Sequence, residues 1–373
     1  MHADDIRGNR LISLDAFRGL TIAGMILVNN PGSWSHVYAP LRHAEWHGWT
    51  PTDLVFPFFL FIVGVAISFS LGNRVDRGDA RTQLYRKVVT RSLLIFAIGL
   101  FLNGFPSFDL STIRYLGVLQ RIALVYLFAS LVVLNLEIKG QAIFAGALLV
   151  GYWALMTLVP VPGYGAGDLS VAGNFAAYFD RFFLSGHMWR ETWDPEGLLS
   201  TLPAISTALL GALVGGLLRS GRDNAAIAAW MFVWGWAGVL SGLIWNPFFP
   251  INKSLWTSSY VLFSTGAALS CLAVCYWLID VQGRRKWAKP AVMMGMNPLA
   301  IFALSALLVK IVVRVRVPVA EGDTVSLYTW IYRTLFVPWV GELNGSLAFA
   351  LTNVALWLVV AAFLYRRSIF IKV

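Results

Sequence analysis

The chain has 373 residues, of which 58% are hydrophobic and only 13% are charged, and its mean hydropathy is +0.67. Soluble globular proteins carry roughly 45–50% apolar and about 25% charged residues, so this composition excludes a soluble fold, a disordered chain and a nucleic-acid-binding domain. The net charge of +10 is instead typical of a membrane protein with basic cytoplasmic segments. Cys271 and Cys275 lie one helical turn apart in an apolar run and cannot form a disulfide framework.

Stretches of apolar residues long enough to cross a bilayer, which takes about 20 residues in a helix, recur along the chain. We expect ten transmembrane helices, at residues 12–30, 53–73, 89–104, 115–135, 141–159, 197–218, 225–245, 255–280, 290–311 and 346–365. The predicted fold is therefore all-α. It is a polytopic membrane protein with about ten spans, and residues 1–373 form a single transmembrane domain.

The distribution of Lys and Arg predicts the orientation of these spans. With the N-terminus inside the cell, the inner segments hold twice as many Lys and Arg residues as the outer segments, so both termini are predicted to be cytoplasmic. The first apolar stretch ends in Asn29-Asn30-Pro31-Gly32 with no small-residue cleavage site, and we expect it to be a retained span. Three outer segments, 31–52, 160–196 and 312–345, are too long to be turns and are expected to be partly helical at the membrane surface.

The first outer segment holds three of the five histidines, His36, His43 and His47, and Asp53 follows at the start of the second span. A carboxylate is favoured at a helix N-terminus, and it could also hold an imidazole N–H and fix the tautomer of the ring. On a functional interpretation one histidine is a general base, because histidine titrates near neutrality. The alternative is that they are polar residues at the membrane interface. A metal site is a weaker interpretation, because His43 and His47, with Glu45 between them, have no obvious third ligand.

Ionisable residues inside apolar spans are functional candidates, because a charge in hydrocarbon costs several kcal/mol. Asp15 and Arg18 are spaced i, i+3 in the first span and can pair. Arg121 lies about two turns inside the fourth span. The alternative to a functional role for Arg121 is a tie to helix-end carbonyls or to a loop acid such as Asp194 or Glu196.

Two further groups of residues allow two interpretations each. Asn29 and Asn30 end the first span, where an amide could stabilise an oxyanion or simply cap the helix. The inner segment 73–91 carries six basic residues, which could bind a polyanion such as a nucleotide phosphate or could only set the orientation in the membrane. No Walker A or Rossmann glycine pattern follows a strand, which disfavours an ATP-driven pump.

A set of motifs, in order along nearly the whole chain, resembles a known family. It is the family of transmembrane acetyltransferases typified by lysosomal heparan-α-glucosaminide N-acetyltransferase and its short bacterial relatives. Each motif is weak alone, but together they are specific. They are SLDAFRG at 13–19, VN at 28–29, HAEWHG at 43–48, DLVFP at 53–57, GVLQR at 117–121, DPEG at 194–197, NKSLWTSSY at 252–260 and GMNP at 295–298.

The resemblance implies a reaction and the residues that carry it. The catalytic histidine of the family falls in a His-Ala-x-Trp motif, which here is His43 and not His36 or His47. The resemblance further implies that Asp53 orients His43 and that Asn29 is the candidate for stabilising the tetrahedral oxyanion. His43 acts either as a general base or as an acetyl carrier in a ping-pong sequence.

The resemblance also implies the substrates. Acetyl-CoA is the acetyl donor, the acceptor is the amine of an amino sugar of the glucosamine type at the outer face, and no metal is expected. The candidates for binding the polyanionic CoA head group are Arg74, Arg86, Lys87 and Arg91, and those for the acceptor are Arg121, Asp194, Glu196 and Trp46.

The expected surroundings are the bacterial inner membrane and its lipids, with no nucleic acid. The glycine-rich stretch 211–216 permits close helix packing and is compatible with a homodimer.

Two other functions stay open at this point. The opening Leu14-Asp15-x-x-Arg18-Gly19 also resembles acyltransferases that modify surface polysaccharides, which indicates O-acylation of a cell-envelope glycan as an alternative. Ten spans with Pro- and Gly-rich breaks are also compatible with a secondary transporter of sugars or amino sugars. The sites of a transporter should lie near the membrane midplane, whereas the histidine and acid cluster lies at one face.

Overall fold

The computed structural model describes residues 11–319 and 323–371. In this part of the chain, nine helices are long and apolar enough to cross a membrane, or ten if one bent pair is a single span, so the all-α polytopic prediction is confirmed. The chain forms two compact units. Unit 1 comprises Met1–His43, Thr50–Phe56 and Val274–Val373, and unit 2 comprises Ala44–Trp49 and Pro57–Ala273. The expectation of one domain stays a prediction.

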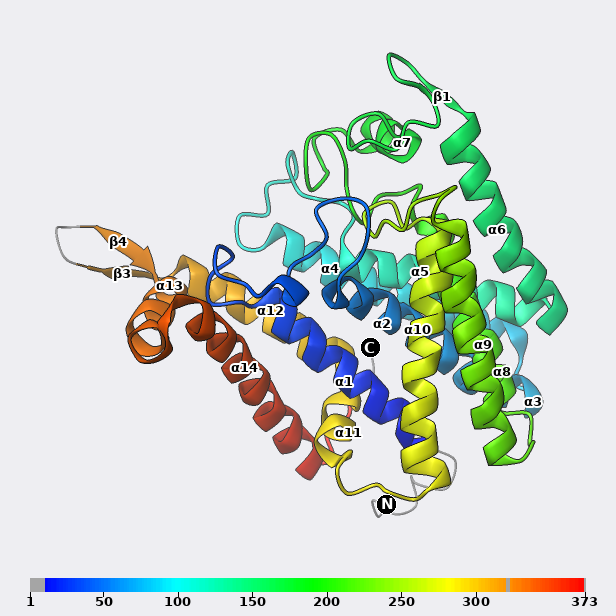
Figure 1. The fold of residues 1–373 in the computed structure, drawn as a ribbon. Helices are drawn as coiled ribbons and strands as arrows, with labels where there is room; N and C mark the ends of the chain where they lie inside the picture. The colour runs from blue at the N-terminus through cyan, green and yellow to red at the C-terminus, as the bar shows by residue number, and fades with distance from the viewer. Residues whose placement is uncertain (1–10, 320–322, 372–373) are drawn as a thin grey trace. The chain divides into compact units, whose positions relative to one another are not determined.

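Unit 1 is built around α1, which is drawn in dark blue beside α11, α12 and α14 in Figure 1. Two antiparallel strands form a small hairpin between α12 and α13, which the sequence did not predict. The elements are α1 (Ile12–Asn29), a short 3-10 helix (Ala39–Leu41), α11 (Lys289–Gly295), α12 (Pro298–Arg314), β3 (Arg316–Pro318), β4 (Thr324–Ser326), α13 (Leu327–Ile331) and α14 (Val337–Arg366), with π-helical turns at Trp277–Val281 and Tyr332–Phe336.

Glycines allow α1 and α11 to pack backbone against backbone. A Cβ atom on Gly19 would lie 1.7 Å from the carbonyl oxygen of Ala291, and one on Gly295 would lie 1.9 Å from that of Asp15. Both positions therefore require glycine. Arg18 extends this contact, because it pairs with Asp15 at 3.2 Å, as the i, i+3 spacing predicted, and donates to the carbonyl of Gly295 at 3.3 Å.

The predicted span at 290–311 is wrong as a single helix. α11 and α12 meet at a bend of 80° between Gly295 and Pro298. Proline cannot donate the backbone hydrogen bond that would continue α11, and it disfavours a helical conformation at Asn297 before it. Asn297 accordingly takes non-helical angles, φ −128° and ψ 51°, and α12 starts again with Pro298 in its first turn.

The side chain of Asn297 binds the C-terminal segment of the chain. The Asn297 amide is 1% exposed; it donates to the carbonyl of Ile369 at 3.0 Å and accepts from the N–H of Ile371 at 2.7 Å. At the start of α1, the N–H of Ser13 donates to Asp280 at 3.1 Å. These contacts bring the start of α1 and residues 369–371 to the α11 end of unit 1.

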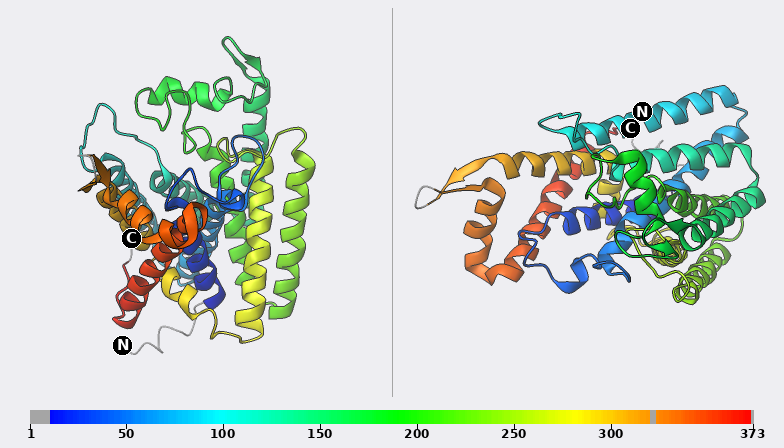
Figure 2. Two further views of the ribbon diagram at one scale, coloured as in Figure 1. Left: turned by 60° about the vertical axis from the view of Figure 1, so that its left-hand side comes forward. Right: turned by 90° about the horizontal axis from the view of Figure 1, so that it is seen from above.

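Unit 2 contains the remaining helices. α9 and α10 lie side by side in all views, and the small β1–β2 hairpin lies beyond the end of α6 (Figures 1 and 2). The elements are α2 (Pro51–Ile67, from Pro57 onward), a π-helical turn (Ser68–Gly72), α3 (Asn73–Asp76), α4 (Arg81–Gly104), α5 (Val118–Asn135), α6 (Ile138–Leu158), β1 (Pro160–Val161), β2 (Gly165–Ala166), α7 (Phe175–Leu184), α8 (Thr201–Leu218), α9 (Asn224–Trp245) and α10 (Ser258–Tyr276, to Ala273).

The glycine-rich stretch at 211–216 packs inside the subunit. A Cβ on Gly211 would lie 2.1 Å from the carbonyl oxygen of Phe61, and one on Gly215 would lie 2.5 Å from the Cβ of Ser68. This face of α8 is thus used against α2 and the turn that follows it. It gives no argument for a homodimer, which stays a prediction without this support.

Several predicted boundaries differ from the structure. α4 begins at Arg81 rather than at residue 89, so its first turns are charged and only its later part is apolar. α14 begins at Val337 rather than at residue 346, and it is kinked at Gly341, whose φ of 76° lies outside the helical region. The long segments 160–196 and 312–345 are partly helical, as predicted, but each also holds a short hairpin.

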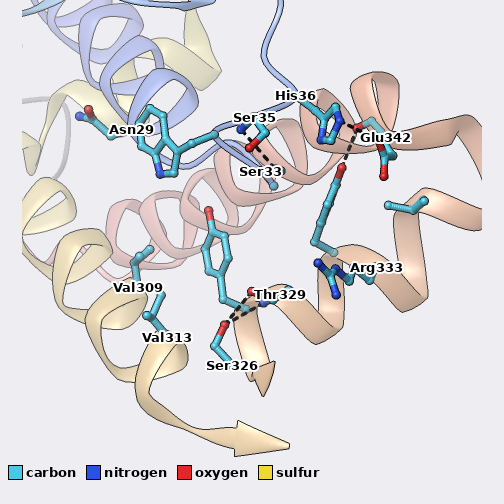
Figure 3. Close-up of a pocket in the computed structure, with 15 residues that line it drawn as sticks. Asn29, Ser33, Ser35, His36, Val309, Val313, Ser326, Thr329, Arg333 and Glu342 are labelled. Atoms are coloured by element: carbon cyan, nitrogen blue, oxygen red, sulfur yellow. Dashed lines mark hydrogen bonds and ion pairs between the residues drawn. The ribbon is translucent and has the colours of Figure 1, made fainter. Parts of the chain in front are cut away.

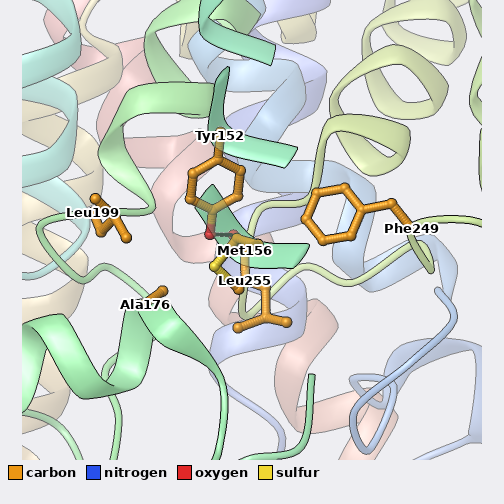
Figure 4. Packing of buried hydrophobic residues seen from close by; sticks show 6 residues of the cluster. All are labelled: Tyr152, Met156, Ala176, Leu199, Phe249 and Leu255. Carbon is orange, nitrogen blue, oxygen red and sulfur yellow. Dashed lines mark hydrogen bonds between the residues drawn. The ribbon is translucent and has the colours of Figure 1, made fainter. Parts of the chain in front are cut away.

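A hydrophobic cluster supports the loops at one end of unit 2. Tyr152 and Met156 of α6 pack with Ala176, Leu199, Phe249 and Leu255, as Figure 4 shows. The Tyr152 hydroxyl donates to the carbonyl of Leu255 at 2.6 Å. Trp46 packs against the same cluster, so the segment that follows His43 in the sequence is anchored on it.

Candidate active site

His43 and Asp53 form a hydrogen-bonded pair in unit 1. His43 Nδ1 lies 2.7 Å from Asp53 Oδ1. Asp53 is 1% exposed, whereas the His43 side chain is 42% exposed. An ionised carboxylate only accepts hydrogen bonds, so Nδ1 carries the proton and Nε2 is the basic nitrogen of the neutral ring. The structure therefore contains the pairing that the sequence suggested, and the catalytic role of the pair stays a prediction.

The position of Asp53 follows from the start of α2. Thr50 precedes the helix, Pro51 is its first residue, and Asp53 lies in its first turn. The backbone N–H of Thr50 donates to Asp53 Oδ2 at 3.1 Å, the reciprocal contact of a capping box. The Thr50 hydroxyl lies 3.2 Å from the same oxygen and 2.6 Å from the carbonyl of Arg42, directly before His43. Thr50 thus ties the histidine segment to the helix that carries the acid.

The two asparagines at the end of α1 have different environments. Asn30 is buried and its amide donates to the carbonyl of Ile26 at 2.7 Å, which is the capping role. Asn29 is exposed and lines a pocket of about 790 Å³ in unit 1 (Figure 3). His43 is not among the described residues that line this pocket, so the pocket does not bring Asn29 and His43 together.

Trp46 and His47 are held by neighbours in unit 2. The indole N–H of Trp46 donates to the carbonyl of Leu169 at 2.8 Å, and its ring meets that of Trp193 edge-on at 5.3 Å. His47 Nδ1 lies 3.3 Å from the amide nitrogen of Asn252 and accepts from it. Burial lowers the pKa of the His47 imidazole. These contacts favour a structural role for His47.

Asp194 and Glu196 are both paired with Arg114. The Arg114 guanidinium binds both carboxylates, with Nε 2.8 Å from Asp194 Oδ2. The pKa of Arg114 is raised: burial alone would lower it, but the hydrogen bond to Asp194 and the charges of both acids outweigh that effect. Asp194 also accepts from the backbone N–H groups of Trp189 and Glu196, each at 2.8 Å. The loop acids therefore organise their own segment, and their hydrogen-bonded basic partner is Arg114, not Arg121.

Arg121 is fully buried in α5 and is bound by neutral groups. Its Nη2 donates to the carbonyl of Gly197 at 2.9 Å and to the Ser200 hydroxyl, and its guanidinium lies 5.1 Å from the centre of the Trp256 ring. Arg121 is thus tied to a carbonyl of the loop before α8, and not to a helix end or a loop acid as the alternative expected. Nε and Nη1 of Arg121 have no hydrogen-bond partner among the described residues. Buried donors of this kind are costly unless something pairs with them.

Asp180 on α7 is a buried acid that the sequence interpretation missed. Its Oδ1 accepts from the N–H groups of Leu198 and Leu199 at 2.9 and 3.3 Å. Burial raises the pKa of the Asp180 carboxyl to about 6, although these hydrogen bonds and Arg121 act in the opposite direction. The sequence signal was a charged pair, Asp180-Arg181, between the aromatic residues Phe179 and Phe182.

The basic residues proposed for the CoA head group differ in their surroundings. Arg74 lies 3.8 Å from Asp79, and the guanidinium of Arg91 lies 4.9 Å from the centre of the Tyr126 ring. Arg86 and Lys87 are exposed on the first turns of α4.

The described residues contain no group of three or more His, Cys, Asp or Glu side chains placed to hold a metal ion.

Comparison with known proteins identifies the family. Residues 10–233, which include His43 and Asp53, match the family model described as heparan-alpha-glucosaminide N-acetyltransferase, catalytic. The chain is 30% identical to heparan-alpha-glucosaminide N-acetyltransferase of Homo sapiens over 98% of this chain and 60% of that protein. It is 31% identical to the Mus musculus protein of the same name over 79% of this chain and 53% of that protein.

The chain thus spans between half and three fifths of the curated relatives that it matches. The family match covers more than half of the chain, and it includes the motifs from the first span to the start of α9. The resemblance seen in the sequence is therefore confirmed, and the chain belongs to the heparan-alpha-glucosaminide N-acetyltransferase family.

Proposed function

We propose that this protein is a membrane-embedded N-acetyltransferase that moves the acetyl group of acetyl-CoA to the amine of an amino sugar. Membership of the family supports the reaction class. The observation that carries the site assignment is the 2.7 Å contact between His43 Nδ1 and Asp53 Oδ1. A half-exposed imidazole oriented by a buried carboxylate is the arrangement that acyl transfer uses for proton movement.

In the direct route, His43 acts through Nε2. Nε2 takes the proton from the sugar amine as the amine nitrogen bonds to the thioester carbonyl carbon. Asp53 stabilises the imidazolium that forms, because its carboxylate already accepts from Nδ1. Nε2 then returns the proton to the CoA sulfur when the carbon–sulfur bond breaks. In the ping-pong alternative, Nε2 itself carries the acetyl group between the two substrates.

The remaining predicted residues have supporting roles in this proposal. Asn29 is the candidate oxyanion donor. This role is supported by its side-chain amide, which makes no hydrogen bond to another described residue. Arg121 is the strongest candidate for an acceptor contact, because two of its buried nitrogens lack a partner. Arg86 and Lys87 are candidates for binding the head group of CoA on the cytoplasmic side. In this proposal His43 lies on the outer side of a bacterial inner membrane. Only an acetyl group crosses the membrane on this arrangement.

The decisive experiment measures acetyl-CoA consumption by detergent-purified protein with a panel of amino sugars. We expect turnover with glucosamine, and we expect His43→Ala to lower kcat by at least about 100-fold, since general bases contribute roughly 10²- to 10⁴-fold. His47→Ala is the matched control from the same segment and should retain most of the activity. Acetylation of a hydroxyl-only glycan instead of glucosamine, or uptake of the sugar by proteoliposomes without acetyl-CoA, would contradict the proposal. Loss of activity in His47→Ala with retention in His43→Ala would refute the site assignment.

A further inference from the structure

α7 is a short helix in the long segment between α6 and α8, and it has no role in the mechanism proposed above. Its ten residues, Phe175–Leu184, extend about 15 Å, whereas the hydrocarbon core of a bilayer is about 30 Å thick. α7 contacts α6 and lies near the end of α6 from which the β1–β2 hairpin emerges (Figure 1). It is therefore a helix at the end of a span and not a span itself.

One face of α7 is fixed to the rest of unit 2. Ala176 and Ala177 are buried, and Asp180 accepts two backbone N–H groups of the turn before α8, at 2.9 and 3.3 Å. The helix begins after Asn174, whose side-chain oxygen caps it by accepting from the N–H of Ala177 at 2.7 Å. These contacts determine which face of α7 points away from the protein.

That outward face is aromatic and exposed. Phe182 is 76% exposed, Phe183 is 57% exposed, and Tyr178 is exposed one turn before Phe182. The ring of Phe183 lies 4.9 Å from that of Phe182 and 4.7 Å from that of Phe179. Covering a phenylalanine side chain stabilises a protein by roughly 1.5–3 kcal/mol. We call Tyr178, Phe182 and Phe183 the aromatic face of α7, and its exposure to water would be unfavourable.

The surface beside α7 indicates what covers its aromatic face. α6 is one of the candidate membrane spans, and it exposes apolar side chains along its length, among them Ile143, Val150 and its last residue, Leu158, which is 73% exposed. Apolar side chains that a membrane span directs away from the protein contact lipid. The lipid-facing surface thus reaches the end of the helix that α7 contacts.

The side chains of α7 also match the edge of a bilayer. Aromatic residues are enriched at the level of the lipid head groups, where one side of the ring meets hydrocarbon and the other meets water. Among residues 175–184 the one acid, Asp180, is buried on the inner face, so Arg181 is the one charge beside the aromatic face. A guanidinium in this position is attracted to lipid phosphates.

We propose that α7 is an interfacial helix, which inserts its aromatic face into the lipid leaflet at the end of α6 and places Arg181 among the lipid phosphates. Amphipathic helices with Phe on one face and a cation beside it lie in the membrane plane in this way. The inner face of α7 holds the turn before α8 through Asp180 at the same time. α7 thus links the bilayer to that turn, and this proposal does not depend on the acetyltransferase activity.

The test measures the membrane depth of a nitroxide attached to α7. In a variant with Cys271→Ala and Cys275→Ala, Phe182→Cys is spin-labelled and the protein is reconstituted in vesicles of phosphatidylcholine and phosphatidylglycerol. Electron paramagnetic resonance then compares the collision rate of the label with oxygen, which enters lipid, and with a nickel chelate, which stays in water on both sides of the bilayer. We expect the oxygen-to-nickel ratio to be several-fold higher than for Glu191→Cys, the matched control, an exposed residue of the loop after α7.

Phe183→Cys provides a second label on the aromatic face and should give the same high ratio, which guards against a distortion caused by one substitution. Ratios at Phe182 and Phe183 as low as that at Glu191 would overturn the proposal, because the aromatic face would then lie in water. Low collision rates with both oxygen and nickel would also overturn it, because the aromatic face would then be covered by protein, such as a second copy of the chain.

Discussion

The proton chemistry proposed for His43 depends on a carboxylate that is itself held by backbone and hydroxyl groups. Asp53 has one oxygen for the imidazole and one for Thr50, so both of its oxygens are engaged. The Thr50 hydroxyl has one proton to donate. Of its two contacts, the one to the carbonyl oxygen of Arg42, at 2.6 Å, is shorter than the one to Asp53 Oδ2, at 3.2 Å. Thr50 is thus a positioning residue for the pair.

Removing the Thr50 hydroxyl should disturb His43 without removing any reacting group. In Thr50→Val the branched shape and the backbone N–H remain, but the tie to Arg42 is lost. We expect kcat to fall about tenfold with little change in KM for either substrate, since only the orientation of the base is affected. Thr50→Ser should restore most of the activity. A Val variant with normal kcat, or a Ser variant as slow as Val, would show that the hydroxyl has no positioning role.

Asp180 gives a prediction about pH and stability. Burial raises the pKa of its carboxyl to about 6, above the usual value of about 3.9 in an unfolded chain. Below pH 4 the carboxyl is protonated in both states and no penalty exists. As the pH rises from about 4 to 6, ionisation of the carboxyl lowers the free energy of the unfolded chain. The free energy of unfolding therefore falls, by up to about 3 kcal/mol.

The variant Asp180→Asn should remove this dependence. It retains a carbonyl oxygen to accept from Leu198 and Leu199 but cannot ionise. We expect its Tm in detergent to exceed that of wild type at pH 7, and the difference to vanish below pH 4. Identical pH profiles of Tm for the two proteins would contradict the raised pKa.

Among elements, α4 differs most from its sequence-based prediction. The apolar run alone placed its start at residue 89, but the helix continues back to Arg81 because Gln83, Leu84, Arg86 and Lys87 are good helix formers. Hydropathy locates the part of a helix that lies in lipid and not the part that extends beyond it. Arg86 and Lys87 are thus on a helix, with fixed spacing, rather than in a loop.

This placement sharpens the prediction for the CoA head group. Arg86→Ala combined with Lys87→Ala should raise the KM for acetyl-CoA several-fold, because two cations near the phosphates are lost, and should leave the KM for the sugar unchanged. The effect should shrink as salt is added, since exposed charges are screened. A matched double variant at Arg284 and Arg285, also exposed, is the control. An unchanged KM for acetyl-CoA would place the head group elsewhere.

The break between α11 and α12 shows the same limit of apolar patterns. Residues 290–311 are apolar except for Asn297, Ser305 and Lys310, and that pattern cannot distinguish one helix from two. The break was visible in the sequence as Asn297-Pro298, a pair that ends helices. The hydrogen bonds from Asn297 to residues 369 and 371 were not predictable, because they join segments separated by about 70 residues.

For the whole molecule, the orientation in the membrane is the prediction with the broadest consequence. In a variant with Cys271→Ala and Cys275→Ala, a single Ala39→Cys should react with a membrane-impermeant maleimide in intact cells, whereas Arg86→Cys should react only after permeabilisation. Both positions are exposed in the structure. The reverse labelling pattern would place His43 on the same side as cytoplasmic acetyl-CoA and remove the need for transfer across the bilayer.

The sequence predicted the fold class and the number of helices well because both depend on composition and apolar length, which are local properties. It also predicted the His43–Asp53 pairing, because Asp53 follows His43 by only ten residues and stands at the start of a predicted helix. It missed Arg114 as the partner of Asp194 and Glu196, and it missed the pocket at the end of α1. Those features arise from segments brought together by packing, and a single sequence carries no direct signal of such contacts.

The hydrogen bonds that link His43 and Asp53 to each other and to Thr50 and Arg42 lie within residues 42–53, and the Arg42 guanidinium also donates to the carbonyl of Val37 at 2.8 Å. A change of chain length between α1 and Val37 would therefore leave these contacts in place, whereas a change between Val37 and Arg42 would disturb the contact that Arg42 makes.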